Sequence, residues 1–380
     1  MIRRKRPVVP FLATLLTGWL AGASPVLEAG EVPEPFAPEL GGIATIQRLQ
    51  ASGDVEALIQ LLRQDPRVLV RAAAAMALAK FREERVHKAL VEALHDRDKW
   101  VRMGAIGALA FLLYFSGIRP WGFLLDRYPS QNLLTWKGQG DKALLLMAHV
   151  DTAKTFFLYH PKRVRHFRTN FLLNATLALS APLLALTFLA WPVGLYFLIQ
   201  TTLLLLRELK APYVEGGNDN ASGVAVATAL FLETEPPAAW RLGLALTGCE
   251  EVGALGAKAL IPHLPQGTLV LNLDNVGRGE LFYAEGEGML LYVPYRGRLL
   301  EAARNTPGAR PLRYRLAYFD TLPLAQRGFP CLSLIRLEQG VPPDWHWPTD
   351  TFARLDEEAL EDTLRYARTL LQRVFHGVSS

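Results

Sequence analysis

The sequence is poor in cysteine, with two such residues in 380. This number excludes the class of small secreted domains whose folds depend on several disulfide bridges. Cys249 and Cys331 each lie within an apolar run. We therefore predict two buried free thiols, with a single disulfide as the alternative, and neither outcome identifies the cellular compartment.

A large excess of either charge is also missing, since the formal net charge is +5 over 41 basic and 36 acidic residues. The one basic cluster, Arg3 to Arg6, lies near the N-terminus and has no interleaved aromatic residues. We therefore expect no nucleic-acid partner. Half of the residues are hydrophobic, which is high for a wholly soluble protein, and the length suggests two or three domains.

Residues 169–206 contain no charged side chain at all. We predict that Trp191-Pro192-Val193-Gly194 divides this stretch into helical arms of about 20 and about 13 residues, of which the first is long enough to cross a bilayer and the second is short for it. The prediction is a helical hairpin inserted into membrane lipid. A pair of core helices or an apolar lid is the alternative, which Pro182 in the first arm would suit.

The first 38 residues follow a secretory pattern. The basic cluster precedes an apolar run at residues 8–23, which ends in the small residues Ala21-Gly22-Ala23. A proline-rich stretch then separates this run from the rest of the chain. We predict a signal peptide or an N-terminal anchor followed by a linker over residues 1–38, with a buried helix as the alternative.

Residues 39–117 are predicted to be entirely helical. Val70-Arg71-Ala72 recurs as Val101-Arg102-Met103, which gives a period of 31 residues. Paired amphipathic helices with such a period resemble short HEAT-type repeats. Two repeats are too few to close a core, so we expect the module to pack on the rest of the chain, on a protein partner or on a preceding helix at residues 43–49. An ordinary helical subdomain is the alternative.

Residues 118–380 combine short apolar runs with helical patterns. Runs rich in Leu, Val and Ala that end at Gly, Pro or acidic residues are typical of buried parallel strands. Their alternation with helices predicts an α/β domain with a mixed, mostly parallel central sheet flanked by helices. The predicted strands are residues 143–147, 241–247, 268–273 and 331–337, and the predicted helices are residues 222–232, 254–260 and 356–374.

Histidines and acidic residues follow the predicted strands of this domain and lie in its loops. Two divalent metal ions that share a site need one carboxylate between them and further hard or borderline ligands on each side. The ends of the strands are where α/β sheets bind their ligands. The candidate residues are His149, Asp151, Asp219, Glu250, Glu251, Asp274 and His346.

Some of these positions suggest a role by themselves. Asp219 is a suitable bridging ligand, because it lies in a glycine-rich turn that can present a carboxylate at close quarters. In the pair Glu250-Glu251, one carboxylate can bind metal while the other accepts a proton from a metal-activated water. Asp151 can orient the imidazole of His149, two residues before it.

The order and context of these residues resemble family twenty-eight of the metallopeptidases, the co-catalytic di-zinc aminopeptidases. The resemblance covers roughly half of the chain, from about Gln131 to the C-terminal helix, and rests on separate motifs. The motifs are Ala148 to Asp151, Asp219 to Ala225, Glu250 to Gly256, Leu273-Asp274 and His346 to Thr351.

This resemblance implies that the protein binds two Zn²⁺ ions and hydrolyses the peptide bond next to a free amino terminus. It implies that Glu250 is the general base and that Asp151 orients the imidazole of His149 without binding metal itself. By the same resemblance, the metal ligands are His149 and Asp274 for one zinc, Glu251 and His346 for the other, and Asp219 for both.

Three features depart from the family's pattern. Trp347 follows the last histidine, where the family usually has a small hydroxylated residue, and this narrows the pocket. Phe319-Asp320-Thr321 replaces an Asp-His pair, which affects a substrate-side contact. The charge-free stretch falls between His149 and Asp219, where the family normally has a short loop. None of these departures removes a metal ligand.

The expected partners are a peptide substrate and membrane lipid, with a protein partner of the helical repeats as a further option. The basic leader predicts a cell-membrane protein with an extracytoplasmic catalytic domain. The basic residues that flank the charge-free stretch favour the opposite orientation. These flanking residues are Lys162, Arg163, Arg165, Arg168, Arg207 and Lys210.

Two other functions compete with a membrane-associated aminopeptidase. A carboxypeptidase or a deacylase would use the same di-zinc site on a different substrate. An inactive, peptidase-like scaffold would bind a partner through the helical repeats. Such a scaffold is expected to have lost a metal ligand or the base, and this sequence has lost neither.

Overall fold

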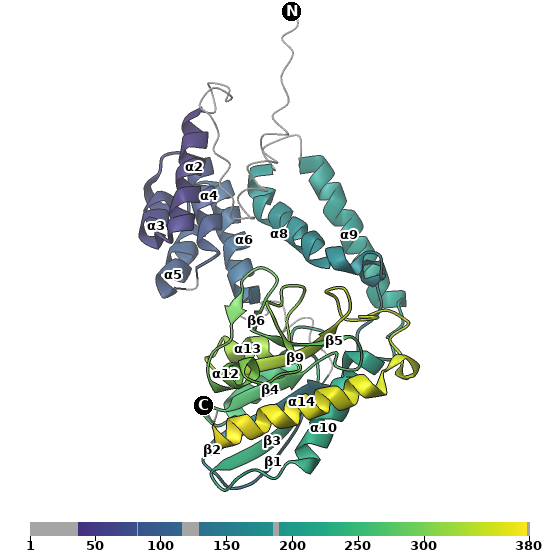
Figure 1. The fold of residues 1–380 in the computed structure, drawn as a ribbon. Coiled ribbons are helices and arrows are strands. Elements are labelled where there is room, and N and C mark those ends of the chain that lie inside the picture. Colours follow the sequence, from purple (N-terminus) through teal and green to yellow (C-terminus); the bar gives the residue numbers. More distant parts are fainter. Residues whose placement is uncertain (1–36, 82, 116–128, 185–189, 378–380) are drawn as a thin grey trace, which may run out of the picture. The chain divides into compact units, whose positions relative to one another are not determined.

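The computed structural model describes residues 37–81, 83–115, 129–184 and 190–377, which form two compact units (Figure 1). One unit comprises the described parts of residues 1–125 and 171–201, and the other comprises the described parts of residues 126–170 and 202–380. The predicted signal peptide or anchor lies outside the described residues. The predicted domain boundary at residues 117 and 118 lies outside them too and stays a prediction.

Five helices form the N-terminal module in the first unit. The helix expected at residues 43–49 is part of α2, which packs on α4 and covers the first of the two repeats. Its Ile46 is buried in the core of the module, and Gln50 Nε2 donates a hydrogen bond of 2.9 Å to the carbonyl oxygen of Ala77. The helices are α2 (Ala37–Ser52), α3 (Val55–Gln64), α4 (Val68–Leu78), α5 (Glu84–Ala93) and α6 (Lys99–Phe115).

Arg71 joins the two repeats from a buried position, with its side chain 3% exposed. Its Nε and Nη2 each donate to the carboxylate of Asp96 over 3.1 Å, and Nη1 donates to the carbonyl oxygen of Asp65 over 2.9 Å. One period later, Arg102 Nη1 donates to the carbonyl oxygen of Asp96 over 2.8 Å. The repeated arginine therefore stabilises the turn between paired helices, and Arg71 also ties one repeat to the next.

The charge-free stretch forms the helices α8 (Phe167–Leu184) and α9 (Ala190–Lys210). The prediction that Trp191 to Gly194 divides the arms was wrong, because α9 begins before them and runs through them. Pro192 is tolerated there since the first turn of a helix needs no backbone N–H from it. The second helix therefore has 21 residues instead of about 13.

Polar side chains connect the two helices of this hairpin. Tyr196 Oη donates to Asn174 Oδ1 over 2.8 Å, and Gln200 Nε2 donates to Tyr196 Oη over 2.7 Å. Residues 191–210 of α9 are, within the described part of the chain, the one stretch that is long and apolar enough to cross a membrane.

The second unit is built on a seven-stranded sheet in the order β1-β3-β2-β4-β9-β5-β8. The pairs β1–β3 and β5–β9 are antiparallel, and the other four pairs are parallel. The predicted mixed, mostly parallel sheet is therefore confirmed. The strands are β1 (Leu133–Lys137), β2 (Lys142–His149), β3 (Trp240–Thr247), β4 (Leu269–Leu273), β5 (Glu280–Ala284), β8 (Arg310–Leu312) and β9 (Cys331–Leu337). A separate hairpin pairs β6 (Gly286–Glu287) with β7 (Val293–Pro294).

Helices flank this sheet. Helix α14, drawn in yellow in Figure 1, packs against both α10 and α12, and α11 packs against α13. Helix α14 begins where the Asp356 carboxylate accepts the N–H groups of Glu358 and Ala359, an N-cap that satisfies otherwise unpaired donors. The helices are α10 (Gly223–Glu233), α11 (Leu255–Leu260), α12 (Arg298–Arg304), α13 (Thr321–Ala325) and α14 (Glu357–His376).

The central strands are apolar because they have neighbours on both sides and helices over them. In β2, every residue from Ala143 to His149 is buried. Both cysteines are free thiols, as predicted, with Cys331 fully buried in β9 and Cys249 half-buried. The buried sheet is a rigid support for the loops that follow its strands.

We expect Arg71→Ala to destabilise the helical module, because it leaves the partly buried Asp96 carboxylate without its partner. The local free energy of opening of α4 and α5, measured by amide hydrogen exchange, should fall by about 3 kcal/mol. The control is Arg63→Ala, which removes an exposed ion pair with Glu92 between the same repeats and should cost less than about 1 kcal/mol. Equal effects of the two variants would contradict the assignment to Arg71.

Candidate metal centre

The site lies where three neighbouring parallel strands end. Strand β2 pairs with β3 on one side and with β4 on the other, so the ends of these strands meet at one edge of the sheet. His149 is the last residue of β2, Glu250 and Glu251 follow β3, and Asp274 follows β4 directly. The topology thus brings together four candidate residues that are far apart in sequence.

Asp219 lies at the centre of the site, with its side chain 3% exposed. Its Oδ1 is 3.1 Å from His149 Nε2, and its Oδ2 is 3.1 Å from His346 Nε2. The two oxygens of one carboxylate therefore face two different histidines. This is the geometry that a bridging ligand requires.

The remaining ligands divide between two pockets that share Asp219. In one pocket, Asp274 Oδ1 is 3.8 Å from His149 Nε2. In the other, Glu251 Oε2 is 3.0 Å from His346 Nε2. In each pocket the donor atoms lie within 4.8 Å of one another, a spacing that can hold a metal ion.

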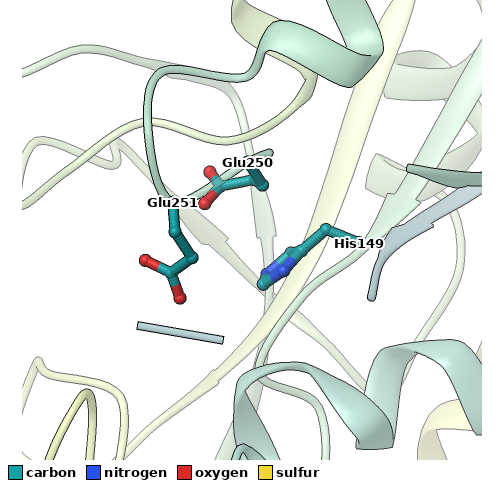
Figure 2. Close-up of side chains that lie close together, drawn as sticks. All are labelled: His149, Glu250 and Glu251. Atoms are coloured by element: carbon teal, nitrogen blue, oxygen red, sulfur yellow. The ribbon is translucent and has the colours of Figure 1, made fainter. Parts of the chain in front are cut away.

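Glu250 faces the same space from the turn that carries Glu251. The carboxylates of both glutamates lie within reach of the ring of His149, and Figure 2 shows the three side chains grouped together. Glu250 is 8% exposed. Its position beside the pockets suits a group that exchanges protons with a bound reactant.

Asp151 makes contacts that differ in part from the predicted ones. Its carboxylate accepts the backbone N–H groups of Glu250, at 3.0 Å, and of Glu251, at 3.2 Å. The Nδ1 atom of His149 is 3.0 Å from the backbone oxygen of Asp151 and 3.8 Å from its Oδ1. Asp151 therefore orients the imidazole mainly through its main chain, while its side chain fixes the turn of the two glutamates.

The turn that carries Asp219 is held by Asp350, to which the sequence analysis assigned no role. The Asp350 carboxylate accepts the N–H of Asn218 at 2.6 Å and that of Asp219 at 3.1 Å. Burial, with a smaller contribution from the charge of Asp219, raises the pKa of Asp350 to about 6, although the N–H of Asn218 opposes this rise. The sequence contained one indication of this role, since Asp350 lies in the motif His346 to Thr351.

Several site residues have an unusual backbone conformation. Cys249, Asn275 and His346 have φ values of 59°, 55° and 53°, in the left-handed region that non-glycine residues rarely adopt. One is a candidate ligand, and the other two are adjacent to candidate site residues. Such conformations persist where the surrounding structure holds them, and they cluster at functional sites.

The pKa values reflect the close packing of acidic and basic groups. Burial lowers the pKa of His149, but contacts with Asp219 and Asp274 outweigh it and hold the pKa well above its usual value. Burial would raise the pKa of Asp219, but the two histidines hold it well below its usual range. Burial raises the pKa of Glu250 strongly; His149 opposes this effect, whereas the charge of Glu251 adds to it.

The donor set fits two divalent cations. Buried carboxylates are costly unless positive charge compensates them, and five acidic groups surround two histidines here. Glu251 Oε1 is buried with no hydrogen-bond partner among the described residues. Imidazole combined with carboxylate suits zinc and similar transition metals better than Mg²⁺ or Ca²⁺, which prefer oxygen ligands alone.

Two further groups near the site were not among the predicted site residues. Burial, with a smaller contribution from the charge of Asp274, raises the pKa of Asp320 to about 7, although His149 opposes this rise. Asp320 Oδ2 accepts a hydrogen bond from Thr247, whereas Oδ1 is buried with no partner in the described structure. The pKa of the buried Tyr314 is raised well above its usual value by burial and by the charge of Asp274.

The departures noted in the sequence have structural counterparts. Thr321 is fully buried, and its hydroxyl donates to Glu287 Oε1 over 2.8 Å and lies 2.9 Å from Ser333 Oγ. Trp347 packs its ring against His160, with the ring centroids 5.1 Å apart. Thr321 thus belongs to a buried polar cluster, while Trp347 contacts the segment that leads to the hairpin.

The fold and the two pockets together define a metal-dependent hydrolase of the α/β class. The family model described as Peptidase family M28 matches residues 133–371, more than half of the chain, so the chain belongs to this family of metallopeptidases. A second family model, HEAT repeats, matches residues 55–114 and confirms the predicted repeat type. No curated protein matches the sequence.

Solved structures with a similar fold include three enzymes. The chain is 17% identical to a zinc aminopeptidase from Bacillus subtilis, with a TM-score of 0.42, over 66% of this chain and 52% of that one. The chain is 17% identical to an aminopeptidase from Aneurinibacillus sp. strain AM-1, with a TM-score of 0.40, over 64% of this chain and 47% of that one. It is 18% identical to a glutaminyl cyclase from Porphyromonas gingivalis, with a TM-score of 0.43, over 64% of this chain and 77% of that one. The chain thus spans about half the length of the two aminopeptidases.

We expect Asp350→Asn to weaken metal binding by roughly 10–100-fold, because the amide replaces one acceptor of the Asp219 turn by a donor. Competition with a chelating dye measures this affinity. The control is Asp344→Asn on the same loop, whose carboxylate pairs with Arg278 and Arg354 and should not affect metal binding. Unchanged affinity in Asp350→Asn would show that the turn holds Asp219 without Asp350.

Proposed function

We propose that the protein is a membrane-anchored zinc aminopeptidase. The observation that carries the proposal is the position of Asp219, whose two carboxylate oxygens face the histidines of two separate pockets. In this proposal the cofactors are two Zn²⁺ ions, and the peptide substrate binds beside them. His149 and Asp274 would hold one zinc, Glu251 and His346 would hold the other, and Asp219 would be shared by the two pockets.

The residues of the chain divide the catalytic work. When bound, zinc acts as a Lewis acid toward the substrate carbonyl and makes water more acidic. Glu250 is the general base: it accepts the proton of the attacking water and passes it to the leaving amine. Asp151 keeps Glu250 in place through the hydrogen bond from the Glu250 backbone N–H.

The charge of the site supports action at an amino terminus. Besides Asp219, Glu251 and Asp274, which contact the histidines of the two pockets, Glu250 and Asp320 are buried acidic groups near the metal positions. The Asp320 Oδ1 atom has no hydrogen-bond partner within the described residues. An α-ammonium group supplies both the charge and the N–H donors that such groups lack, whereas a substrate carboxylate would be repelled.

The hairpin α8–α9 is proposed to insert into the membrane. Large apolar side chains of α9 are exposed, and an apolar surface of this kind normally indicates a contact with lipid or protein. Its base is fastened to the catalytic unit, where Arg168 Nε donates to the carbonyl oxygen of Met289 and Arg207 Nη2 to that of Lys154. The exposed residues of α9 include Trp191, Leu195, Ile199, Leu205 and Leu209.

The orientation in the membrane is part of the proposal. The basic leader in the sequence supports a catalytic unit outside the cytoplasm, as the sequence analysis expects. The HEAT repeats are a proposed binding surface for a protein partner, since stacked helix pairs of this type form extended surfaces for recognition.

The function is tested with the purified protein and two adjacent variants. We expect hydrolysis of peptides with a free amino terminus and none of peptides that are blocked there. Glu250→Gln should lower kcat by about 10²–10⁴-fold and retain two zinc ions, because it removes only the base. Glu251→Gln should lose metal from one pocket, because it changes a ligand. Zinc content and steady-state rates measure both effects.

Each alternative function has its own outcome in this experiment. Cleavage from the carboxyl terminus would identify a carboxypeptidase, and release of an acyl group from a blocked substrate would identify a deacylase. Full activity of Glu250→Gln would contradict its role as base. A wild-type protein that binds partners but neither zinc nor peptide would be a scaffold.

Membrane insertion and orientation are tested together by thiol labelling with an impermeant maleimide. Ile199→Cys on α9 should remain unreactive in intact cells and in lysed membranes, because lipid covers it. Leu232→Cys, 68% exposed on α10, should react in intact cells if the catalytic unit faces outward. Equal reactivity of the two positions would contradict insertion, and labelling of Leu232→Cys only after lysis would place the catalytic unit in the cytoplasm.

A further inference from the structure

The candidate ligand His346 lacks the support that a metal-binding histidine usually has. Such a histidine normally donates its second ring N–H to a carboxylate, a carbonyl or water, which fixes the orientation of the ring. His149 follows this rule through the backbone oxygen of Asp151. The Nδ1 atom of His346 is buried and has no hydrogen-bond partner in the described part of the chain.

Aromatic rings surround His346 instead. The ring of Tyr159 meets it edge-on, with the centroids 4.4 Å apart and the planes at 67°. The ring of Trp345 lies 4.6 Å from it at 42°. Contacts of this kind prefer particular ring orientations and can stabilise one rotamer of a buried side chain. The Nε2 atom of His346 contacts Asp219 and Glu251, and the ring packing is the support that the imidazole has in place of a partner for Nδ1.

Tyr159 is itself fixed by aromatic contacts. It stacks on Phe167, with the centroids 5.3 Å apart and the planes at 22°, and it meets Trp345 edge-on at 5.2 Å. Phe167 also contacts Trp345 at 5.3 Å. Three rings thus form a mutually braced cluster, in which Tyr159 and Trp345 each contact both Phe167 and the ligand. Trp345 directly precedes the ligand in the chain, whereas Tyr159 comes from a distant segment.

The position of Tyr159 in the chain is informative. It lies in the short 3-10 helix Phe157–Tyr159, between the end of β2 and the start of α8. Phe167 is the first residue of α8. The segment that leads from His149 into the hairpin therefore also supplies the packing for the histidine of the other pocket.

We infer that Tyr159 is a positioning residue for His346 and that its ring, not its hydroxyl, performs this function. The insertion between His149 and Asp219 thereby completes the pocket of Asp219, Glu251 and His346. This inference rests on the proposed function, because it assigns His346 to zinc. The pocket of His149 and Asp274 does not depend on Tyr159.

Zinc binding by the purified full-length protein tests the inference, with a chelating dye as competitor. We expect Tyr159→Ala to lower the binding affinity for one of the two zinc ions by roughly 10–100-fold and to leave the affinity for the other unchanged. Tyr159→Phe should bind both zinc ions as the wild type does, since it keeps the ring. Phe167→Leu removes the ring that stacks on Tyr159 but keeps apolar volume. It should lower the affinity for the same zinc ion to a smaller extent.

The matched control is Phe157→Ala, in the same 3-10 helix. The ring of Phe157 contacts Phe156 and the guanidinium of Arg163, and it is 39% exposed. This variant should bind both zinc ions normally. A loss equal to that of Tyr159→Ala would show that any disturbance of the segment weakens the pocket, and would overturn the specific role of Tyr159.

Other outcomes separate this inference from the proposed function. If the wild type binds two zinc ions and Tyr159→Ala binds both equally well, the inference is wrong and the function stands. If Tyr159→Phe is as weak as Tyr159→Ala, the hydroxyl and not the ring acts on His346, which also overturns it. If Tyr159→Ala does not fold, unchanged zinc binding in Phe167→Leu contradicts the inference. A wild type without zinc would overturn both.

Discussion

The structure of the site depends on one buried carboxylate. Asp219 must present each of its oxygens to a different histidine, and a side chain with that task has no freedom to rotate. The turn around it is held by Asp350, which accepts the N–H groups of Asn218 and Asp219. His149, the two glutamates and Asp274 are arranged around this fixed point from three strand ends, and His346 comes from the loop that follows β9.

The same constraint explains why acidic residues appear at two levels of the structure. The inner level consists of Asp219, Glu251 and Asp274, whose carboxylates contact the two histidines. Those of the outer level, Asp151 and Asp350, accept backbone N–H groups of the turns that carry the inner ones. A carboxylate is suited to this second task because its two oxygens can accept two successive N–H groups of one turn. The main chain of the turns that carry Asp219 and Glu251 is therefore fixed by hydrogen bonds and not by side-chain packing alone.

Much of the fold could be predicted from the sequence, because it follows from local patterns. The four predicted strands are each a run of apolar residues that has a neighbouring strand on both sides in the sheet. Such a run can be recognised from its own residues without knowledge of distant contacts. The second helix of the hairpin was predicted too short, because Trp191 to Gly194 was interpreted as a break and not as a first turn. A proline before an apolar run has both meanings, and only the course of the chain distinguishes them.

The candidate site was predictable to the extent that its residues lie in motifs. The contacts of Asp151 and Asp350 were not, since they involve backbone N–H groups contributed by turns that are distant in sequence. Asp320 was noted only as part of a departure from the family's pattern, because its buried Oδ1, which has no partner among the described residues, is apparent only in the structure. Tyr314 was missed because its proximity to the site results from the folding of the loop between β8 and β9, and no spacing in the sequence reports it. Tyr159 belongs to the same category, because its partner His346 is far along the chain.

The two ends of the insertion meet at the edge of the catalytic unit. Lys154 and Tyr213 form a β-bridge, and the N–H of Val214 donates to the carbonyl oxygen of Ala153 over 2.9 Å. The two ends of the insertion are therefore adjacent, as the two ends of a short turn at this position would be. A segment of this kind can be gained, exchanged or lost in evolution without a change in the path of the chain at His149 or Asp219.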